Sequence, residues 1–149
     1  MLYFDTSFLV PLILAEDTSV AVAKFFRDVD TDKLTTSHLA RLEFVSMIAR
    51  VVRMGRLRSD AAQEAEVTFE NLMARSFLVI LPTADDYEAA RKMLGQYDSG
   101  LRAGDALHLA IALNHGAQSL YSLDKRMIAI GSALDLTMND GLALDGYNN

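Results

Sequence analysis

Four acidic residues stand inside or just after apolar stretches of this sequence, at positions far apart in the chain. Asp5 follows the apolar residues 1–4, and Asp124 comes soon after a short β-rich run. Glu43 and Asp105 lie within segments whose neighbours are mostly apolar. A carboxylate in such surroundings is costly unless it is paired or coordinated. We therefore take these four acids as the candidate catalytic and metal-binding residues.

The chemistry that suits such a set is metal-assisted hydrolysis. Four carboxylates close together would repel one another, and a divalent cation relieves that repulsion. Mg²⁺ and Mn²⁺ prefer oxygen ligands and keep some of their waters, which suits the hydrolysis of a phosphodiester. The hydroxyls of Thr6, Ser7 and Ser122 are placed to hydrogen-bond the ligating acids or a phosphate as supporting residues.

Each acid also has a purely structural explanation. Asp5 fits a turn, Asp124 fits a helix N-cap, and Glu43 fits the wet face of a helix. Asp105 fits the first turn of a helix, where the helix dipole favours an acid. Small residues at 103, 104 and 106 favour a site at Asp105, because they let another group approach the backbone closely.

The elements that must position these acids alternate along the chain between strand and helix. A strand that begins at residue 2 has no earlier element, so we expect it inside the sheet. The apolar run 77–81 predicts a buried strand. The predicted strands are 2–5, 34–36, 77–81, 119–122 and 134–138, and the predicted helices are 8–15, 19–29, 38–54, 59–75, 83–97, 101–114 and 124–131. This order predicts an α/β fold: a three-layer α/β/α sandwich around a mainly parallel sheet of about five strands.

In such a sheet, ligands bind outside the carboxyl ends of the strands, where the strand order reverses. Asp5 and Asp124 each follow a strand, whereas Glu43 and Asp105 lie in helices that leave the same side of the sheet. If the strands before Asp5 and Asp124 are neighbours, all four acids converge on one crevice.

Composition limits the function classes. The chain has 149 residues, no Cys and a net charge of −6, which predicts one domain over 1–149, without disulfides or thiolate zinc sites. The negative charge argues against a general polyanion binder. The sequence has neither a secretory signal nor an apolar run long enough for a membrane, so we expect a cytoplasmic protein.

Two further features of the sequence each have two interpretations. A basic stretch is formed by Arg50, Arg53, Arg56 and Arg58. The favoured interpretation is a solvated helix end, because cations are stabilised at helix C-termini. The other interpretation is contact with a phosphate or a partner. His108 lies three residues after Asp105 and has no second His nearby, so a packing role is favoured over metal binding.

The ordered set of motifs resembles the PIN domain. It comprises a hydrophobic-Asp-Thr-Ser start, the acid at 43, the segment 101–110 and Ser122-Leu123-Asp124. The resemblance covers about residues 1–140, and the length and the segment 101–110 are similar to VapC-type toxins of toxin–antitoxin pairs.

The resemblance implies an endoribonuclease that depends on Mg²⁺ or Mn²⁺, with the four acids as its ligands. Ser122 stands where the family often has Thr, and it keeps the hydroxyl. Lys125 and Arg126 stand where some relatives carry a further acid, which leaves one or two metal ions open. The implied partners are an RNA substrate, a cognate antitoxin and a second copy of the chain, with no membrane. The surfaces for these proteins are expected on helices 17–29 and 38–54, with Phe25, Phe26, Val45 and Met47 as candidates.

Competing interpretations remain. A haloacid dehalogenase-type phosphotransferase would need an Asp where Ser7 stands, and a receiver domain would need an Asp after residues 77–81, where Pro82 stands. An RNA-processing PIN nuclease outside a toxin pair, and a catalytically silent PIN-fold binding module, stay open. Loss of two or more acids would favour the silent module, and all four are present.

Overall fold

The central feature of the fold is a five-stranded sheet, seen in a computed structural model that describes residues 1–140 and 142. The strand order is β3-β2-β1-β4-β5, and every neighbouring pair is parallel. The strands are β1 (Leu2–Phe4), β2 (Leu34–Ser37), β3 (Leu78–Ile80), β4 (Ser119–Tyr121) and β5 (Met138–Asn139). Leu2 is in register with Leu34 on one side and with Ser119 on the other. The first strand is therefore an inner strand, as predicted.

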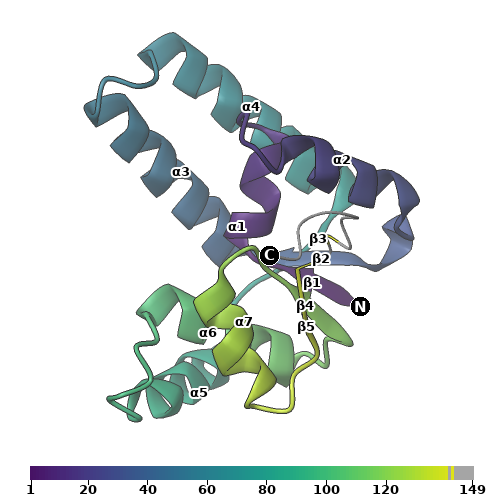
Figure 1. The fold of residues 1–149 in the computed structure, drawn as a ribbon, viewed down its shortest axis with the longest axis vertical. Helices are drawn as coiled ribbons and strands as arrows, with labels where there is room; N and C mark the ends of the chain where they lie inside the picture. The colour runs from purple at the N-terminus through teal and green to yellow at the C-terminus, as the bar shows by residue number, and fades with distance from the viewer. Residues whose placement is uncertain (141, 143–149) are drawn as a thin grey trace.

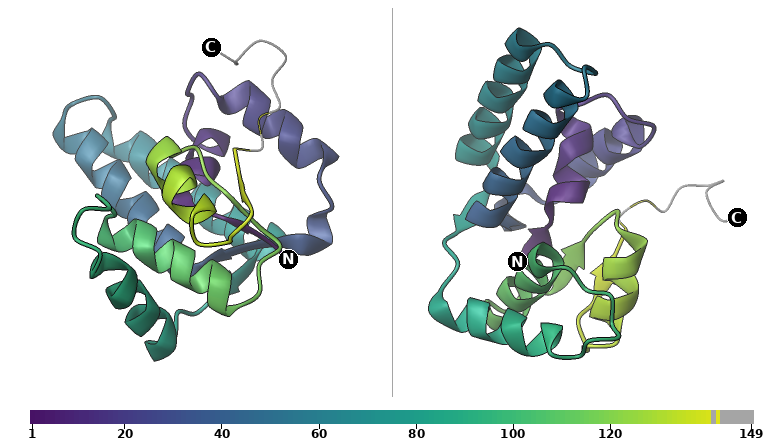
Figure 2. Two further views of the ribbon diagram at one scale, coloured as in Figure 1. Left: turned by 60° about the horizontal axis from the view of Figure 1, so that its bottom comes forward. Right: turned by 90° about the vertical axis from the view of Figure 1, so that its left-hand side faces the viewer.

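Helices cover both faces of this sheet (Figure 1, Figure 2). One face carries α1 to α4 and the other carries α5 to α7, with α3 and α4 running side by side beyond the sheet. The helices are α1 (Thr6–Leu9), η1 (Val10–Leu12), α2 (Ser19–Asp28), η2 (Thr31–Lys33), α3 (His38–Arg53), α4 (Ser59–Ser76), α5 (Ala84–Leu94), α6 (Ala103–Asn114) and α7 (Lys125–Ser132). The predicted three-layer α/β/α sandwich is confirmed.

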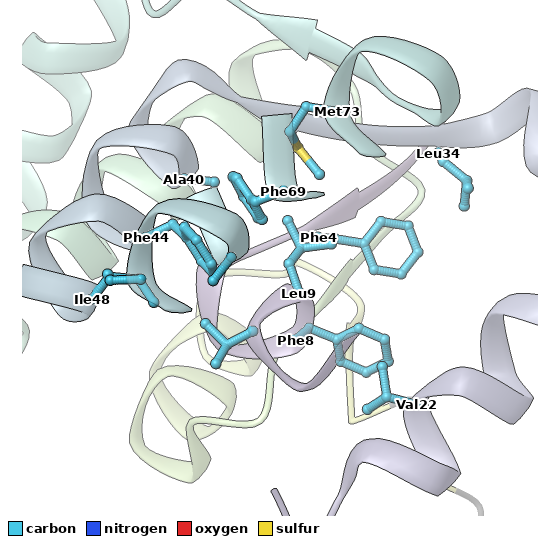
Figure 3. Packing of buried hydrophobic residues seen from close by; sticks show 13 residues of the cluster. Phe4, Phe8, Leu9, Val22, Leu34, Ala40, Phe44, Ile48, Phe69 and Met73 are labelled. Carbon is cyan, nitrogen blue, oxygen red and sulfur yellow. The ribbon is translucent and has the colours of Figure 1, made fainter. Parts of the chain in front are cut away.

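The two faces of the sheet contact separate hydrophobic clusters. Successive side chains of a strand point to opposite faces, so Phe4 enters one cluster and Tyr3 enters the other. Figure 3 shows Phe4 and Phe8 packed together on one side of the first cluster, with Leu9 between them and Phe44. Phe44 of α3 stacks on Phe69 of α4 with ring centroids 4.0 Å apart. This packing fixes α1 and α3 against the carboxyl end of β1.

The sheet also reverses its strand order at β1. The chain moves outward from β1 through β2 to β3, and then returns to β4 on the other side of β1. The carboxyl ends of β1 and β4 therefore flank the position where α/β sheets bind ligands.

Two strand predictions are wrong in their details. Within the run 77–81, Leu78–Ile80 forms the edge strand β3, and Leu78 and the following Leu81 are exposed at 65% and 71%. Apolar composition predicted burial there, but no strand pairs with its outer side among the described residues. The last strand is Met138–Asn139 instead of 134–138, because Asp135 adopts a positive φ of 58° that interrupts an extended run.

Helix boundaries differ in a similar way. The predicted helix 8–15 is a short α1 that starts at Thr6 and continues as η1, which contains Pro11. The predicted helix 83–97 ends at Leu94, and 101–114 begins at Ala103. None of the described helices is long and apolar enough to cross a membrane.

Two of the four residues expected at partner surfaces pack against the protein's own core instead. Phe25 and Phe26 of α2 are half-buried and pack on Phe4 and Phe8, so they are not free surface residues. Val45 of α3 is 40% exposed.

Candidate functional site

A pocket of about 420 Å³ lies where the sequence places the four acids. It forms at the carboxyl ends of β1 and β4, between α3 and the start of α6. Its lining residues are Asp5, Thr6, Ser7, Val10, Glu43, Ser46, Met47, Arg50, Arg53, Arg102, Asp105, His108 and Asp124. Asp5, Glu43, Asp105 and Asp124 come from four elements and meet at this one pocket.

Asp5 is the most buried of the four acids, with 3% of its surface exposed. It is the N-cap of α1, and its Oδ1 accepts hydrogen bonds from the Phe8 backbone N–H and from Ser7 at 2.7 Å. Its Oδ2 accepts a hydrogen bond from Ser122 at 2.6 Å. Burial raises the pKa of Asp5, and His108, Ser122 and Ser7 oppose that rise. Ser7 and Ser122 thus hold the Asp5 carboxylate in one orientation.

Glu43 reaches the pocket from α3 and is fixed on three sides. Thr6 donates a short hydrogen bond to its Oε2, and His108 Nε2 lies 2.8 Å from the same oxygen. A Cβ atom on Gly104 would clash with Glu43 Oε1, so the carboxylate occupies the space left by the missing side chain. Burial alone would raise the pKa of Glu43, but the hydrogen bond and charge of His108, with the Thr6 hydroxyl, lower it below its ordinary value.

His108 is buried, as a packing residue would be, but its hydrogen bonds connect it to the pocket. Its Nδ1 lies 2.8 Å from the hydroxyl of Tyr3, which in turn donates to Ser37 at 2.9 Å. Burial raises the pKa of Tyr3, so this hydroxyl stays neutral. The chain from Ser37 through Tyr3 and His108 to Glu43 was not predicted. The only sequence signal for it was the three-residue spacing between Asp105 and His108.

Asp105 and Asp124 form the other side of the acidic lining. Asp105 lies in the first turn of α6 and Asp124 is the N-cap of α7, so the structural explanations for both hold. Asp124 Oδ1 accepts from the backbone N–H groups of Arg126 and Met127. Desolvation raises the pKa of Asp105, and the charges of Asp124 and Glu43 raise it further. The charges of Asp124 and Glu43 therefore repel that of Asp105 across the pocket.

The chemistry of these donors suits a hard divalent cation, because every acid offers carboxylate oxygen and their charges repel. As the side chains stand, no three His, Asp or Glu residues among residues 1–140 and 142 form a group that could hold a metal ion. The donor set fits a cation, and holding one would require the carboxylates to move toward it.

The basic stretch divides between the pocket and the surface. Arg50 and Arg53 line the pocket, whereas Arg58 pairs with Asp60. Arg41, one helical face earlier, pairs with Glu70 at 2.7 Å. The interpretation as a solvated helix end therefore does not account for Arg50 and Arg53, which face the pocket.

Comparison with solved structures finds the same fold in several proteins. VapC20 of Mycobacterium tuberculosis, a toxin that cleaves the sarcin-ricin loop, is 21% identical with a TM-score of 0.72, covering 88% of this chain and 95% of its own. VapBC-1 of nontypeable Haemophilus influenzae is 16% identical with a TM-score of 0.68, covering 95% and 98%. FitAcB of Neisseria gonorrhoeae is 14% identical with a TM-score of 0.65, covering 97% and 100%. At these identities the similarity establishes the fold.

The sequence itself gives the family. No curated protein matches the chain closely enough to count as a relative. The model of the PIN domain matches residues 2–132, which is most of the chain and includes all four acids of the pocket. The chain therefore belongs to the PIN domain family.

Proposed function

We propose that this protein is an endoribonuclease that depends on Mg²⁺ or Mn²⁺ and hydrolyses RNA phosphodiester bonds. The observation that carries the proposal is the convergence of Asp5, Glu43, Asp105 and Asp124 on one pocket at the switch point of the sheet. Membership of the PIN domain family and the similarity to VapC20, a toxin that cleaves the sarcin-ricin loop, support it.

In this proposal, Asp5, Glu43, Asp105 and Asp124 hold the cation. The cation, when bound, would activate a water and stabilise charge on the phosphate. Ser7 and Ser122 keep Asp5 oriented, and Thr6 and His108 keep Glu43 oriented. These hydrogen bonds limit the orientations that the two carboxylates can take as they move toward a cation.

The test is cleavage of a labelled RNA with Mg²⁺, Mn²⁺ or EDTA. Wild-type protein should cut RNA only with a cation, and Asp5→Asn or Asp105→Asn should abolish cleavage while leaving the fold intact. Both variants should keep the stability of wild type or be slightly stabilised, because like-charge repulsion or burial of charge is relieved. Glu43→Gln and Asp124→Asn should also impair cleavage. Asp17→Asn, an exposed acid outside the pocket, is the matched control. Cleavage in EDTA, or wild-type rates from Asp105→Asn, would contradict the proposal.

We further propose that the protein is the toxin of a type II toxin–antitoxin pair, acting as a homodimer and silenced by a small cognate antitoxin. The VapC-like resemblance and the toxin VapC20 among the structural neighbours support this role. A short neighbouring gene whose product binds DNA, co-purifies with this protein and suppresses RNA cleavage is the expected result. Without such a gene, an RNA-processing role would be favoured. Sedimentation of the purified protein tests the dimer.

A further inference from the structure

One face of α3 carries both an acid of the pocket and two arginines. Glu43, Met47, Arg50 and Arg53 all line the pocket, and their spacing places them on one stripe of the helix. With a rise of 1.5 Å per residue, Arg50 lies about 10 Å and Arg53 about 15 Å along the axis from Glu43. Arg102 lines the pocket from the start of α6.

We propose that Arg50, Arg53 and Arg102 form a phosphate track that binds the RNA backbone beside the scissile bond. The inference rests on the proposed nuclease function, because it takes the carboxylates as the place of cleavage. A chain with its scissile phosphate at these acids would extend its next phosphates along α3, where the two guanidinium groups lie.

The three arginines are available for a ligand, unlike their neighbours. Arg41 pairs with Glu70 and Arg58 pairs with Asp60, whereas Arg50, Arg53 and Arg102 make no side-chain ion pair or hydrogen bond within the described residues. All three are exposed at the pocket. A guanidinium presents a planar set of donors that matches a phosphate.

The helix dipole does not explain all three positions. Cations are favoured at the C-terminal end of a helix, which accounts for Arg50 and Arg53 in the last turn of α3. Arg102 is the N-cap of α6, where the same dipole disfavours a cation. A requirement for positive charge around the pocket accounts for all three.

The charges around the pocket also favour a polyanion that arrives with a cation. Without counting the imidazole of His108, the four carboxylates and three guanidinium groups of the lining sum to one net negative charge, and one divalent cation makes that sum positive. In a protein of net charge −6, this is a local reversal. RNA should therefore bind better when the divalent cation is present.

The lining predicts recognition of the backbone rather than of bases. Among the residues that the structure describes, no Phe, Tyr or Trp lines the pocket, and the imidazole of His108 is buried, so no exposed ring is available there for stacking of bases. Contacts from arginine to phosphate position a nucleic acid without reading its sequence. The track should therefore contribute similarly to the binding of different single-stranded RNAs.

The test compares wild-type protein with Arg50→Gln/Arg53→Gln, using fluorescence anisotropy of a labelled single-stranded RNA. Ca²⁺ serves as the cation, and a denaturing gel checks that the RNA is intact. Loss of two phosphate contacts should weaken binding about tenfold at low salt, and should reduce the slope of log affinity against log salt by about 1.4. Arg102→Gln should reduce the slope by about 0.7. Arg75→Gln, an exposed arginine of α4 outside the pocket, is the control and should bind as wild type does.

Unchanged RNA affinity and salt slope in Arg50→Gln/Arg53→Gln would overturn the inference. So would an equal loss of affinity for a polyglutamate peptide of matched charge, which would assign the arginines to an acidic protein partner. If the variant loses RNA binding as expected but wild-type protein cuts no RNA with Mg²⁺ or Mn²⁺, the track stands and the nuclease proposal fails. If wild-type protein cuts RNA but wild type and variant bind it equally well, the nuclease proposal stands and the track fails.

Discussion

At the scale of single residues, the position of Glu43 depends both on hydrogen bonds with its neighbours and on the space that a glycine leaves. Thr6 and His108 hold one carboxylate oxygen, and the absent side chain of Gly104 makes room for the other. His108 is itself fixed by the buried hydroxyl of Tyr3. Two of these positions, Gly104 and Tyr3, allow the arrangement to be tested without altering an acid.

Gly104→Ala should reduce cleavage without unfolding the protein. The added methyl group would displace the Glu43 carboxylate, and loss of such support typically costs about 10- to 100-fold in activity. The free energy of unfolding should change by no more than about 1 kcal/mol, since alanine is the better helix former. Cleavage kinetics and urea denaturation measure the two effects. Ala103→Gly, an exposed change in the same helical turn, should keep wild-type cleavage.

Tyr3→Phe should destabilise the protein by about 1–3 kcal/mol. Without the hydroxyl, His108 Nδ1 and Ser37 Oγ lose a buried hydrogen-bond partner. Tyr121→Phe on the neighbouring strand is the control, because its hydroxyl makes no hydrogen bond within the described residues. Equal free energies of unfolding for both variants in urea would show that the Tyr3 hydroxyl contributes nothing.

Single residues also show which parts of the candidate site could be predicted from the sequence. The apolar settings of Asp5 and Asp105 made the candidate acids visible, because a buried charge needs a reason. The small residue at 104 indicated a close approach to the backbone, but its occupant, Glu43, is 61 positions away and could not be named. The link between His108 and Glu43 was missed for the same reason: the contact joins distant segments and leaves no local pattern.

At the scale of elements, the alternation of strands and helices was predictable, whereas positions within the sheet were not. Hydrophobic runs and caps gave the order of the elements, and the start at residue 2 gave the inner strand. The exposure of β3 depends on the strand order, which a run of apolar residues does not encode. The short last strand depends on a left-handed turn at Asp135, a residue type that tolerates this conformation.

One contact between elements has a consequence for pH. Asp86 of α5 is fully buried and accepts hydrogen bonds from the Thr83 backbone N–H and from the Asn114 amide of α6, while His115 lies 3.1 Å away. Desolvation opposes ionisation, but the donors from Thr83, Asn114 and His115 lower the pKa of Asp86. The Asp86 carboxylate therefore joins α5 to the end of α6.

Asp86→Asn should reduce the free energy of unfolding at pH 7 by about 1–3 kcal/mol, because it removes a hydrogen-bonded charge. A lowered pKa means that this contribution is complete above about pH 4, the ordinary Asp range, and is lost as the pH falls through the folded-state value. The difference from wild type should therefore shrink in acid. Urea denaturation at pH 7 and at lower pH measures it, and Asp85→Asn, an exposed neighbour, should match wild type. A difference that grew in acid would contradict the assignment.

At the scale of the whole molecule, the sandwich brings four distant acids to one edge, where the carboxylates repel one another. The two hydrophobic clusters hold β1 from both faces, so Asp5 has little freedom to move away. Desolvation and the charges of Asp124 and Glu43 raise the pKa of Asp105. This repulsion between the carboxylates is the reason to expect a cation, and the cation is the point on which the proposed chemistry depends.

Isothermal titration of Mn²⁺ into the purified protein tests that point most directly. We expect saturable binding at millimolar Mn²⁺ or below in wild-type protein. We also expect Asp105→Asn, a variant that should remain folded, to lose at least about tenfold in affinity. The Asp17→Asn control should bind as wild type does. No binding at millimolar Mn²⁺, or equal affinity in Asp105→Asn and wild type, would contradict the claim that these carboxylates hold a catalytic cation.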